Sequence, residues 1–423
     1  MSPPAEKIWT NLGLMRLNAF GVGVNGLFLA VETVMLPVLV LVLAPEALKN
    51  TFLAMLGFTG LIVAAVVQVI IGRVSDRTRS PLGRRVPYLL WGCSFILLGM
   101  VGVGLAPTFW FLLGAWLFIQ ANVNIAYGPY QALIQDLVPV TRTGAASSFK
   151  ILADAVGGVA FIKISSVLMG YYTGPDSAQW LWITLSVLGV NLVVATGITS
   201  VTVVARERST PTAINATHTP VPVASGLHPQ LSLFLISRFL MVTAIAVFQT
   251  YGLFFLRDKV GLEAPTQALG NMILVAGGAV ALSAYSAGWL SDRIGRKQVV
   301  LAGAAGAAVS TVWMLWAGTE TEVMVIATVI GFFVGSLLSA NWAMANDLGT
   351  EGREGLHMGA VNLSTIGGAA FAKLLGPGVD LLNRASAGSG YSTLLVGCAV
   401  LFILGAILLM PVEPRLHRAP PSV

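Results

Sequence analysis

The chain contains apolar stretches that are long enough to cross a lipid bilayer. Of its 423 residues, 56% are hydrophobic and only 10% are charged, whereas a soluble domain carries about 25% charged residues. A membrane-spanning helix needs about 20 predominantly apolar residues in succession, and the stretches here reach that length. A protein this apolar has too little polar surface to stay in solution, so the sequence indicates an integral membrane protein.

The apolar stretches alternate with short polar loops along the whole chain. In lipid, only helices and closed barrels satisfy all their backbone hydrogen-bonding groups, and the alternating ten-residue strands of a barrel are absent from the sequence. We therefore predict an all-α membrane protein with twelve transmembrane helices. The predicted spans are residues 14–43, 51–72, 86–106, 108–135, 144–171, 179–204, 230–256, 266–290, 298–317, 321–346, 356–380 and 390–411.

Basic residues are concentrated at one side of the predicted spans. With the N-terminus in the cytoplasm, only Lys49, Arg257, Lys259 and Arg384 fall outside. The positive-inside rule then predicts a multi-pass protein of the plasma (inner) membrane with both termini cytoplasmic and without a cleavable signal peptide. The basic residues counted on the inner side are Lys7, Arg16, Arg73, Arg77, Arg79, Arg84, Arg85, Arg142, Arg206, Arg208, Arg238, Arg293, Arg296, Lys297, Arg353, Arg415 and Arg418.

The chain divides into two halves that repeat one another. A segment rich in Pro, Ser, Thr and Ala at residues 206–229 has the composition of a flexible cytoplasmic linker, and it separates residues 1–205 from residues 230–423. Asp136, Arg142 and Gly144 have counterparts 211 residues later, which are Asp347, Arg353 and Gly355. We predict two pseudo-symmetric six-helix bundles, a plan in which a transported solute binds between the halves near mid-depth.

The same short basic loop occurs in both halves, as Gly72–Arg85 and, four residues shorter, as Gly288–Lys297. The second copy fits the pattern G-x-x-x-D-R-x-G-R-[RK] without gaps. This loop, between spans two and three and again between spans eight and nine, resembles the signature of the major facilitator superfamily over the whole chain. The longer first copy, within residues 75–92, resembles that of the glycoside–pentoside–hexuronide cation symporters and the related sucrose-type proton symporters.

The resemblance implies a secondary transporter that works by alternating access. It also implies that the loop carboxylates and arginines latch the cytoplasmic side in one conformation, although the same residues could serve only to fix topology. The expected cytoplasmic gate residues are Asp76, Arg77, Arg84, Arg85, Asp136, Arg142, Asp292, Arg293, Arg296, Asp347 and Arg353.

Ionisable residues inside the spans are candidates for ion coupling, because a charge in the bilayer centre is costly. Lys150 and Asp154 lie four residues apart on one helix face, where they can pair either as a proton-exchanging couple or as a static brace. Glu32 is the second candidate acid, one turn before Pro37, which should bend its helix. Lys163 and Lys373 lie near span ends, where long side chains can reach the interface.

The driving ion is expected to be the proton. The sodium-coupled members of the resembling group carry acidic residues in span two, whereas residues 51–72 contain none, and Gln68 is the only strongly polar side chain there. A proton needs only one suitable carboxylate, so Asp154, Glu32 and Lys150 are the proton-coupling candidates.

A stripe of uncharged polar residues follows one face of span four. Its spacing of four, three and four residues is that of a helix face, and its amides and Tyr hydroxyl suit a hydroxylated solute as well as interhelical hydrogen bonding. A sparser polar set lies in the second half. The substrate-binding candidates are Asn25, Gln120, Asn124, Tyr127, Gln131, Gln249, Tyr251, Asn341, Trp342, Asn346 and Asn362.

The sequence predicts a transporter of a small polar solute, a sugar or glycoside, with proton-coupled uptake. A proton-driven exporter of amphipathic compounds and a non-transporting membrane factor of the same fold are the alternatives. The four His have no metal-ligand spacing and no phosphate loop is present, so we expect no enzyme activity, no catalytic residue, no cofactor and no metal site. The expected partners are the solute, protons and the lipid bilayer, without nucleic acid, and the expected state is a monomer.

Overall fold

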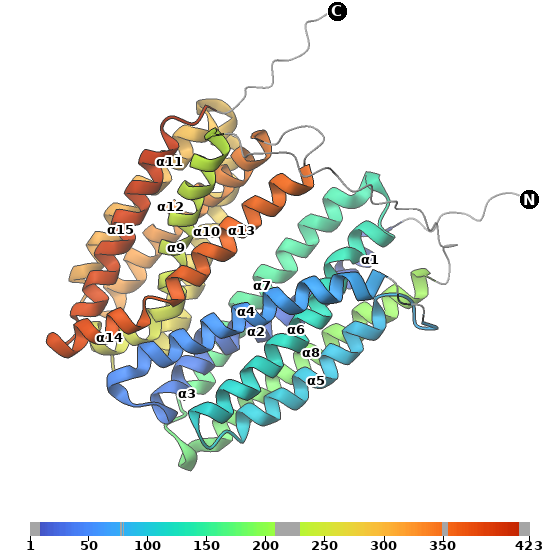
Figure 1. Ribbon diagram of the computed structural model, residues 1–423, viewed down its shortest axis with the longest axis horizontal. Coiled ribbons are helices and arrows are strands. Elements are labelled where there is room, and N and C mark those ends of the chain that lie inside the picture. Colours follow the sequence, from blue (N-terminus) through green and yellow to red (C-terminus); the bar gives the residue numbers. More distant parts are fainter. Residues whose placement is uncertain (1–8, 77, 79, 208–228, 349–353, 414–423) are drawn as a thin grey trace, which may run out of the picture. The chain divides into compact units, whose positions relative to one another are not determined.

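The computed structural model of the protein describes residues 9–76, 78, 80–207, 229–348 and 354–413. Its regular elements in these residues are all helices, and twelve helical segments are long and apolar enough to cross a membrane. They begin and end within a few residues of the predicted spans, so the all-α fold class and the number of spans are confirmed. Figure 1 shows these helices along the chain.

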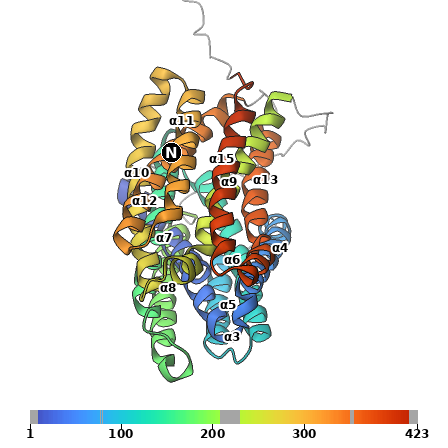
Figure 2. The ribbon, with the colours of Figure 1, turned by 90° about the vertical axis from the view of Figure 1, so that its left-hand side faces the viewer.

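Contacts between residues divide the chain into two compact units. The first unit comprises Met1–Pro45 and Leu56–Ala216. Its helices include α2, which lies against α7 and α8, and α5, which lies against α6 and α8. Figure 2 shows α5 beside α6. The bounds are α1 (Asn11–Leu17), α2 (Ala19–Ala30), α3 (Leu36–Leu43), α4 (Lys49–Asp76), α5 (Val86–Gly104), α6 (Phe109–Leu137), α7 (Thr143–Met169) and α8 (Ala178–Glu207).

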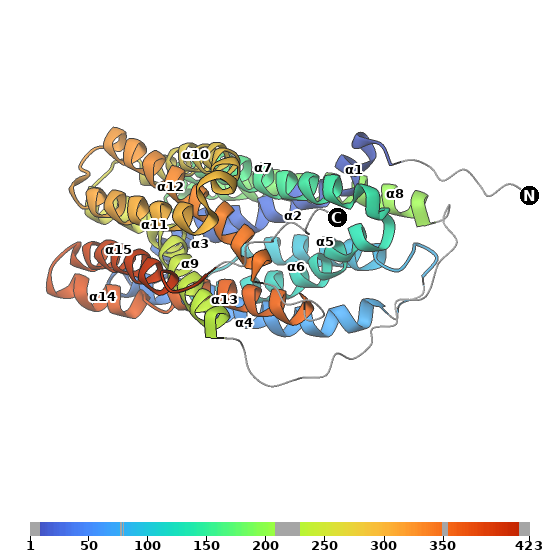
Figure 3. The ribbon, with the colours of Figure 1, turned by 90° about the horizontal axis from the view of Figure 1, so that it is seen from above.

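The second unit comprises Glu46–Met55 and Thr217–Val423. Within it α9 lies against α13 and α15, and α12 lies against α10 and α11, as the view from above in Figure 3 also shows. The first turns of α4 group with this unit, whereas the rest of α4 groups with the first. The remaining bounds are α9 (Pro229–Phe255), α10 (Pro265–Ile294), α11 (Arg296–Trp313), α12 (Glu320–Asp347), α13 (Glu354–Lys373), α14 (Gly376–Ala385) and α15 (Ser389–Leu409).

The first span is not one continuous α-helix. The segment η1 (Val31–Met35) is a π-helix between α2 and α3. Pro37 follows it, in the first turn of α3. A proline has no N–H and its ring collides with the carbonyl four residues before it, and a wider π turn is one way in which a helix relieves that collision. Glu32 lies within this π turn, and the bend expected at Pro37 stays a prediction.

The two copies of the basic loop have the same backbone signature. Gly83 and Gly295, the glycines that precede Arg84 and Arg296, have φ values of 94° and 98°. Residues other than glycine rarely adopt a positive φ of this size, so glycine is needed at both positions. The predicted linker at residues 206–229 falls mostly on residues 208–228, which lie outside the described residues, and it stays a prediction together with the boundaries drawn from it.

Candidate functional site

A polar cluster in the first unit is centred on Asp154 of α7. Its Oδ2 accepts from Lys150 Nζ at 2.8 Å, one helical turn away. Its Oδ1 accepts from Asn25 Nδ2 of α2, also at 2.8 Å. Asp154 therefore joins two helices of this unit, and the i,i+4 pair that the sequence suggests is present.

Aromatic rings of α6 surround the ammonium group of this cluster. Lys150 Nζ donates to the Tyr127 hydroxyl at 3.3 Å and lies 5.2 and 5.4 Å from the ring centroids of Tyr127 and Tyr130. Cation–π contacts of this kind stabilise a desolvated ammonium. The two tyrosine rings and the carboxylate thus hold Lys150 inside the helix bundle, where a lone charge would be costly.

The backbone of α2 approaches this cluster very closely at Gly21. A Cβ added there would lie 2.3 Å from Asp154 Oδ1 and 2.8 Å from the Tyr130 hydroxyl. Neither atom belongs to a long flexible side chain that could move away cheaply. Glycine at position 21 is therefore required for the carboxylate to occupy its place between Asn25 and Lys150.

The remaining candidates of the first unit have different surroundings. Glu32 is half-buried on η1. In the span-four stripe, Gln120 and Asn124 are buried, and Asn124 Nδ2 donates to the Gln120 carbonyl at 2.9 Å within the same helix. Gln120 Oε1 has no hydrogen-bond partner, and Gln131 is exposed. Of the stripe, only Tyr127 belongs to the Asp154 cluster, and the substrate role of these residues stays a prediction.

In the second unit, polar groups surround Arg238, which the charge count places among the basic residues on the inner side of the membrane. Arg238 of α9 is 2% exposed. Its Nη1 donates to Asn341 Oδ1 of α12 and its Nε donates to Thr365 Oγ1 of α13 at 3.0 Å. Its guanidinium carbon lies 4.4 Å from the Trp342 ring centroid. The charge count could not reveal this burial, because it assigns an Arg near the end of an apolar span to the adjacent loop.

The other candidates of the second unit do not join this group. The Tyr251 hydroxyl donates to the Lys373 carbonyl at 3.0 Å. Gln249, Asn346 and Asn362 are exposed. Of the six predicted residues in this unit, Asn341 and Trp342 are thus the two that contact Arg238, and the roles of all six remain predictions.

The predicted gate loops form ion pairs inside each unit. Asp136 Oδ2 lies 2.8 Å from Arg84 Nη2 and 2.8 Å from Arg85 Nε. At the equivalent place in the second unit, Arg296 pairs with Asp347, so the ion pair of the first half is repeated. Arg142 Nη2 donates to Asn11 Oδ1 at 2.6 Å. Arg293 stacks on Trp289 at 3.8 Å.

Four predicted gate residues lie outside the part of the chain whose side chains the structure describes. These residues are Asp76, Arg77, Asp292 and Arg353. Their role in a latch therefore stays a prediction.

A buried polar cluster at the start of α4 was not predicted. Asp380 of α14 accepts four hydrogen bonds from the first turn of α4. Its Oδ1 accepts from the Asn50 backbone N at 3.3 Å and from Asn50 Nδ2 at 2.8 Å. Its Oδ2 accepts from the Thr51 backbone N at 2.7 Å and from Thr51 Oγ1 at 2.6 Å. Lys49 pairs with Asp258 of the segment η5 (Leu256–Val260) at 2.7 Å. Tyr391 donates to the same carboxylate at 2.6 Å. The free N–H groups of a helix N-terminus carry partial positive charge, so Asp380 caps α4 from another helix.

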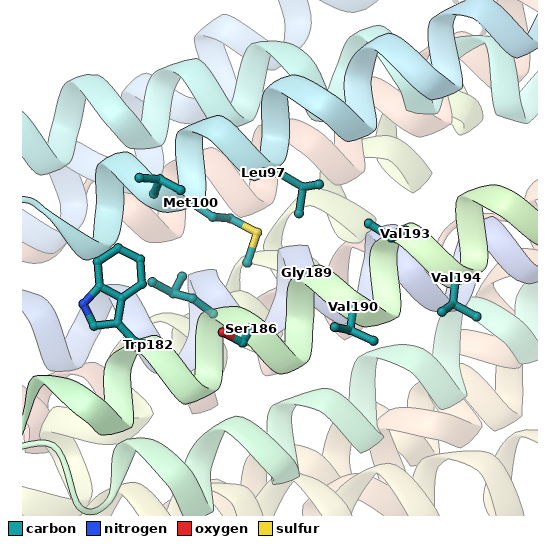
Figure 4. Close-up of a pocket in the computed structure, with 10 residues that line it drawn as sticks. Leu97, Met100, Trp182, Ser186, Gly189, Val190, Val193 and Val194 are labelled. Atoms are coloured by element: carbon teal, nitrogen blue, oxygen red, sulfur yellow. The ribbon is translucent and has the colours of Figure 1, made fainter.

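An apolar groove between α5 and α8 of the first unit is drawn in Figure 4. Leu97, Met100, Trp182 and Val190 line it, and Ser186 is its polar residue. Val190 is 63% exposed, as expected of a side chain that faces lipid. The groove lacks the hydrogen-bonding groups that a polar solute needs, so it is not a candidate for that site.

Comparison with known proteins agrees with this architecture. A family model described as "MFS/sugar transport protein" matches residues 19–353. Sucrose transport protein SUT1 of Oryza sativa is 28% identical over 158 residues, which cover 32% of this chain and 28% of that protein. Sucrose transport protein SUC4 of Arabidopsis thaliana is 32% identical over 127 residues, or 26% and 23% of the two chains. The matches thus span less than a third of the length of these relatives.

Solved structures of similar fold cover almost the whole chain. The crystal structure of a D-xylose-proton symporter has a TM-score of 0.70 at 14% identity and covers 95% of this chain and 98% of its own. That of a bacterial homologue of the human lysosomal transporter Spinster has a TM-score of 0.69 at 14% identity and covers 97% and 98%. Such low identities show the fold alone. Together with the family match, they show that the chain is a transporter rather than an enzyme and belongs to the MFS/sugar transport protein family.

Proposed function

We propose that the protein moves a small polar solute, a sugar or a glycoside, across the plasma membrane by alternating access, with uptake coupled to protons. The observation that carries this proposal is the Asp154 cluster. A carboxylate held between an amide and an ammonium on neighbouring helices can change its partners when it gains a proton. Protonation of Asp154 would remove the negative charge that holds Lys150, and the cation–π contacts with Tyr127 and Tyr130 would then be its main support.

The nature of the solute is supported by the chemistry of the first unit and by the relatives. Amides and a tyrosine hydroxyl are donors and acceptors without net charge, which suit the hydroxyl groups of a sugar. The partial matches are named as sucrose transport proteins, and a structure of the same fold is named as a xylose-proton symporter. These names describe the other proteins, and they favour a sugar for this one.

The alternation is supported by the cluster at the start of α4. Residues 46–55 are held by Asp380 and Asp258 of the second unit, while the rest of α4 groups with the first unit. With the termini in the cytoplasm, this cluster lies at the outer ends of its helices and the Arg84–Asp136 and Arg296–Asp347 pairs lie at the inner ends. Each of these contacts lies inside one unit, and the two ends of the helices are where we propose that the gates lie.

The proposal is tested by uptake into proteoliposomes that contain the purified full-length protein. Radiolabelled sucrose, xylose and a panel of glycosides are offered with an inside-alkaline pH gradient, with a sodium gradient, or with neither. We expect accumulation of at least one solute that depends on the pH gradient and not on sodium. Accumulation that requires sodium and ignores pH would overturn the proton coupling.

The role of the carboxylate is tested by Asp154→Asn in the same vesicles. Accumulation driven by the pH gradient should be lost, whereas exchange of internal for external solute should persist, because exchange needs no net proton movement. Glu32→Gln tests the second candidate acid. Asp176→Asn, which changes an exposed carboxylate of the short 3-10 helix η4 (Pro175–Ser177), is the matched control and should accumulate solute normally. Normal accumulation by both the Asp154 and the Glu32 variant would contradict the assignment.

A further inference from the structure

The eleventh span is broken into two helices. α13 ends at Lys373 and α14 begins at Gly376, and Figure 1 shows the two as separate helices. Pro377 lies in the first turn of α14. A proline has no N–H, so in a continuous helix it would leave the carbonyl four residues before it, that of Lys373, without a hydrogen bond. The proline therefore accounts for the break.

A side chain from another helix satisfies the carbonyl that the proline leaves free. The Tyr251 hydroxyl of α9 donates to the Lys373 carbonyl at 3.0 Å and shares the same proton with the Ala372 carbonyl at 3.3 Å. Tyr251 is 2% exposed. A buried carbonyl without a partner is costly, and in a membrane a neighbouring helix can supply the missing partner. Tyr251 thus replaces the N–H that Pro377 lacks.

The short helix beyond the break is bonded to the start of α4. Asp380 of α14, which is 4% exposed, accepts all four hydrogen bonds from Asn50 and Thr51. The two backbones also approach closely at Gly376, where an added Cβ would lie 2.2 Å from the Asn50 carbonyl oxygen. We call α14 and the first turn of α4 the outer block, because buried contacts join them.

Polar groups hold the outer block against the rest of the second unit. Lys49 pairs with Asp258 of η5 at 2.7 Å. The Tyr391 hydroxyl of α15 donates to the same carboxylate at 2.6 Å and accepts from Asn50 Nδ2 at 3.2 Å. These contacts define a closed position of the block against η5 and α15, whereas its connection to α13 is the proline break.

We propose that the outer block moves as one lid that pivots at the break between Lys373 and Pro377, and that Tyr251 is the positioning residue that holds the break in its closed form. The role of this lid at the solute entrance rests on the proposed transport function. The pivot does not, because it can be measured in the purified protein without solute or gradient. A failure of uptake in vesicles would therefore leave the test below unaffected.

The test measures the distance between two spin labels by double electron–electron resonance in the full-length protein. One label is on Leu381→Cys of α14 and the other on Val309→Cys of α11, at side chains that are 67% and 71% exposed. Both positions belong to the second unit. The buried native cysteines Cys93 and Cys398 are changed to Ala in every sample. We expect the distance of the closed position and a second distance, and a single distance in every variant would overturn the pivot.

Tyr251→Phe keeps the ring and removes the hydroxyl that bonds the Lys373 carbonyl. It should raise the ratio of the second population to the closed one about tenfold, within the range for a buried group left without its partner. Tyr285→Phe, which changes a tyrosine of α10 that is 87% exposed, is the matched control and should give the wild-type ratio. A wild-type ratio in Tyr251→Phe would overturn the positioning role.

A second label pair shows whether the block moves as one. Ala47 is exposed and lies two residues before α4, so Ala47→Cys takes the place of Leu381→Cys beside the same reference label. Both pairs should respond to Tyr251→Phe with the same change of ratio. A change confined to the Leu381 pair would show that α14 moves without the start of α4, and the lid would be refuted.

Pro377→Ala tests the pivot independently and serves if Tyr251→Phe does not fold. Alanine supplies the N–H that the Lys373 carbonyl lacks within the span, so α13 and α14 should join and the second distance should disappear. Tyr251→Phe added to Pro377→Ala should then have no further effect. A wild-type ratio in Pro377→Ala would show that the break is not the pivot, and a tenfold effect of Tyr251→Phe in the double variant would show that the hydroxyl acts elsewhere.

Discussion

The contact between Asp380 and the first turn of α4 allows one prediction to be worked out in detail. Each carboxylate oxygen accepts two hydrogen bonds, Oδ1 from Asn50 and Oδ2 from Thr51. Asp380→Asn replaces one of these oxygens by an NH₂ group, which cannot accept, and it removes the negative charge from the helix N-terminus. At about 1.5–3 kcal/mol for each hydrogen bond to a charged group, two lost bonds cost about 3–6 kcal/mol.

This cost should appear in the exchange of backbone amide hydrogens. The Thr51 N–H lies in the first turn of α4, where a helix provides no backbone acceptor of its own, so Asp380 is its source of protection. A loss of about 3 kcal/mol corresponds to a rate of opening and exchange that is roughly a hundredfold higher. Hydrogen exchange read by mass spectrometry on a peptide that covers residues 46–55 measures this directly.

Two comparisons show whether the effect is specific. Asp176→Asn removes an exposed carboxylate elsewhere and should leave the exchange of this peptide unchanged. A peptide from α6 in the Asp380→Asn protein should also exchange as in the wild type, which shows that the fold is retained. If the Asp380→Asn protein is folded and residues 46–55 exchange at the wild-type rate, Asp380 does not hold the start of α4.

The remaining predictions concern the Asp154 cluster and the first gate loop. Gly21→Ala should lower the free energy of unfolding by about 1–3 kcal/mol through overpacking and reduce transport. At Gly197 an added Cβ meets no atom within 4 Å, so Gly197→Ala should leave the free energy of unfolding unchanged. Equal midpoints of thermal unfolding for the two variants would contradict the close approach at Gly21. Arg85→Gln breaks a buried pair and should destabilise the protein by about 3 kcal/mol or more, whereas Arg84→Gln, at a side chain 40% exposed, should cost about 1 kcal/mol or less. Chemical denaturation of both variants checks this order, and a larger loss for Arg84→Gln would refute it.

The fold was largely predictable because its determinants are local in sequence. Length and apolarity decide which segments cross a bilayer. Spacing alone also brought Lys150 and Asp154 together, because residues four apart on a helix are neighbours. The positive φ at Gly83 and Gly295 matches the repeated glycine of the two loops in the same way.

The unpredicted parts of the site depend on contacts between distant segments. Asp380 lies 330 residues after Asn50, and neither residue stands out in the sequence as part of a pair. Asn18, Asn25 and Glu32 are spaced by seven, which in an unbroken helix would place them on one face. The chain interrupts this face at Asn18, which lies between α1 and α2 and is 1% exposed, with its Nδ2 bonded to the Ala146 carbonyl at 3.2 Å. Helical periodicity cannot reveal such an interruption, because it assumes an unbroken helix.

The π segment η1 has a consequence for the length of the first span. A π-type hydrogen bond encloses one residue more than an α-type bond, so the segment accommodates one additional residue within the same helix. In a continuous α-helix that residue would turn every later side chain by about 100°. The directions in which the side chains of Leu36–Leu43 point from the helix axis therefore depend on the additional residue in η1, and they do not continue the periodicity of α2. A homologue without a π turn here would be expected to be one residue shorter between Ala30 and Leu36 while presenting the same side chains to its neighbours.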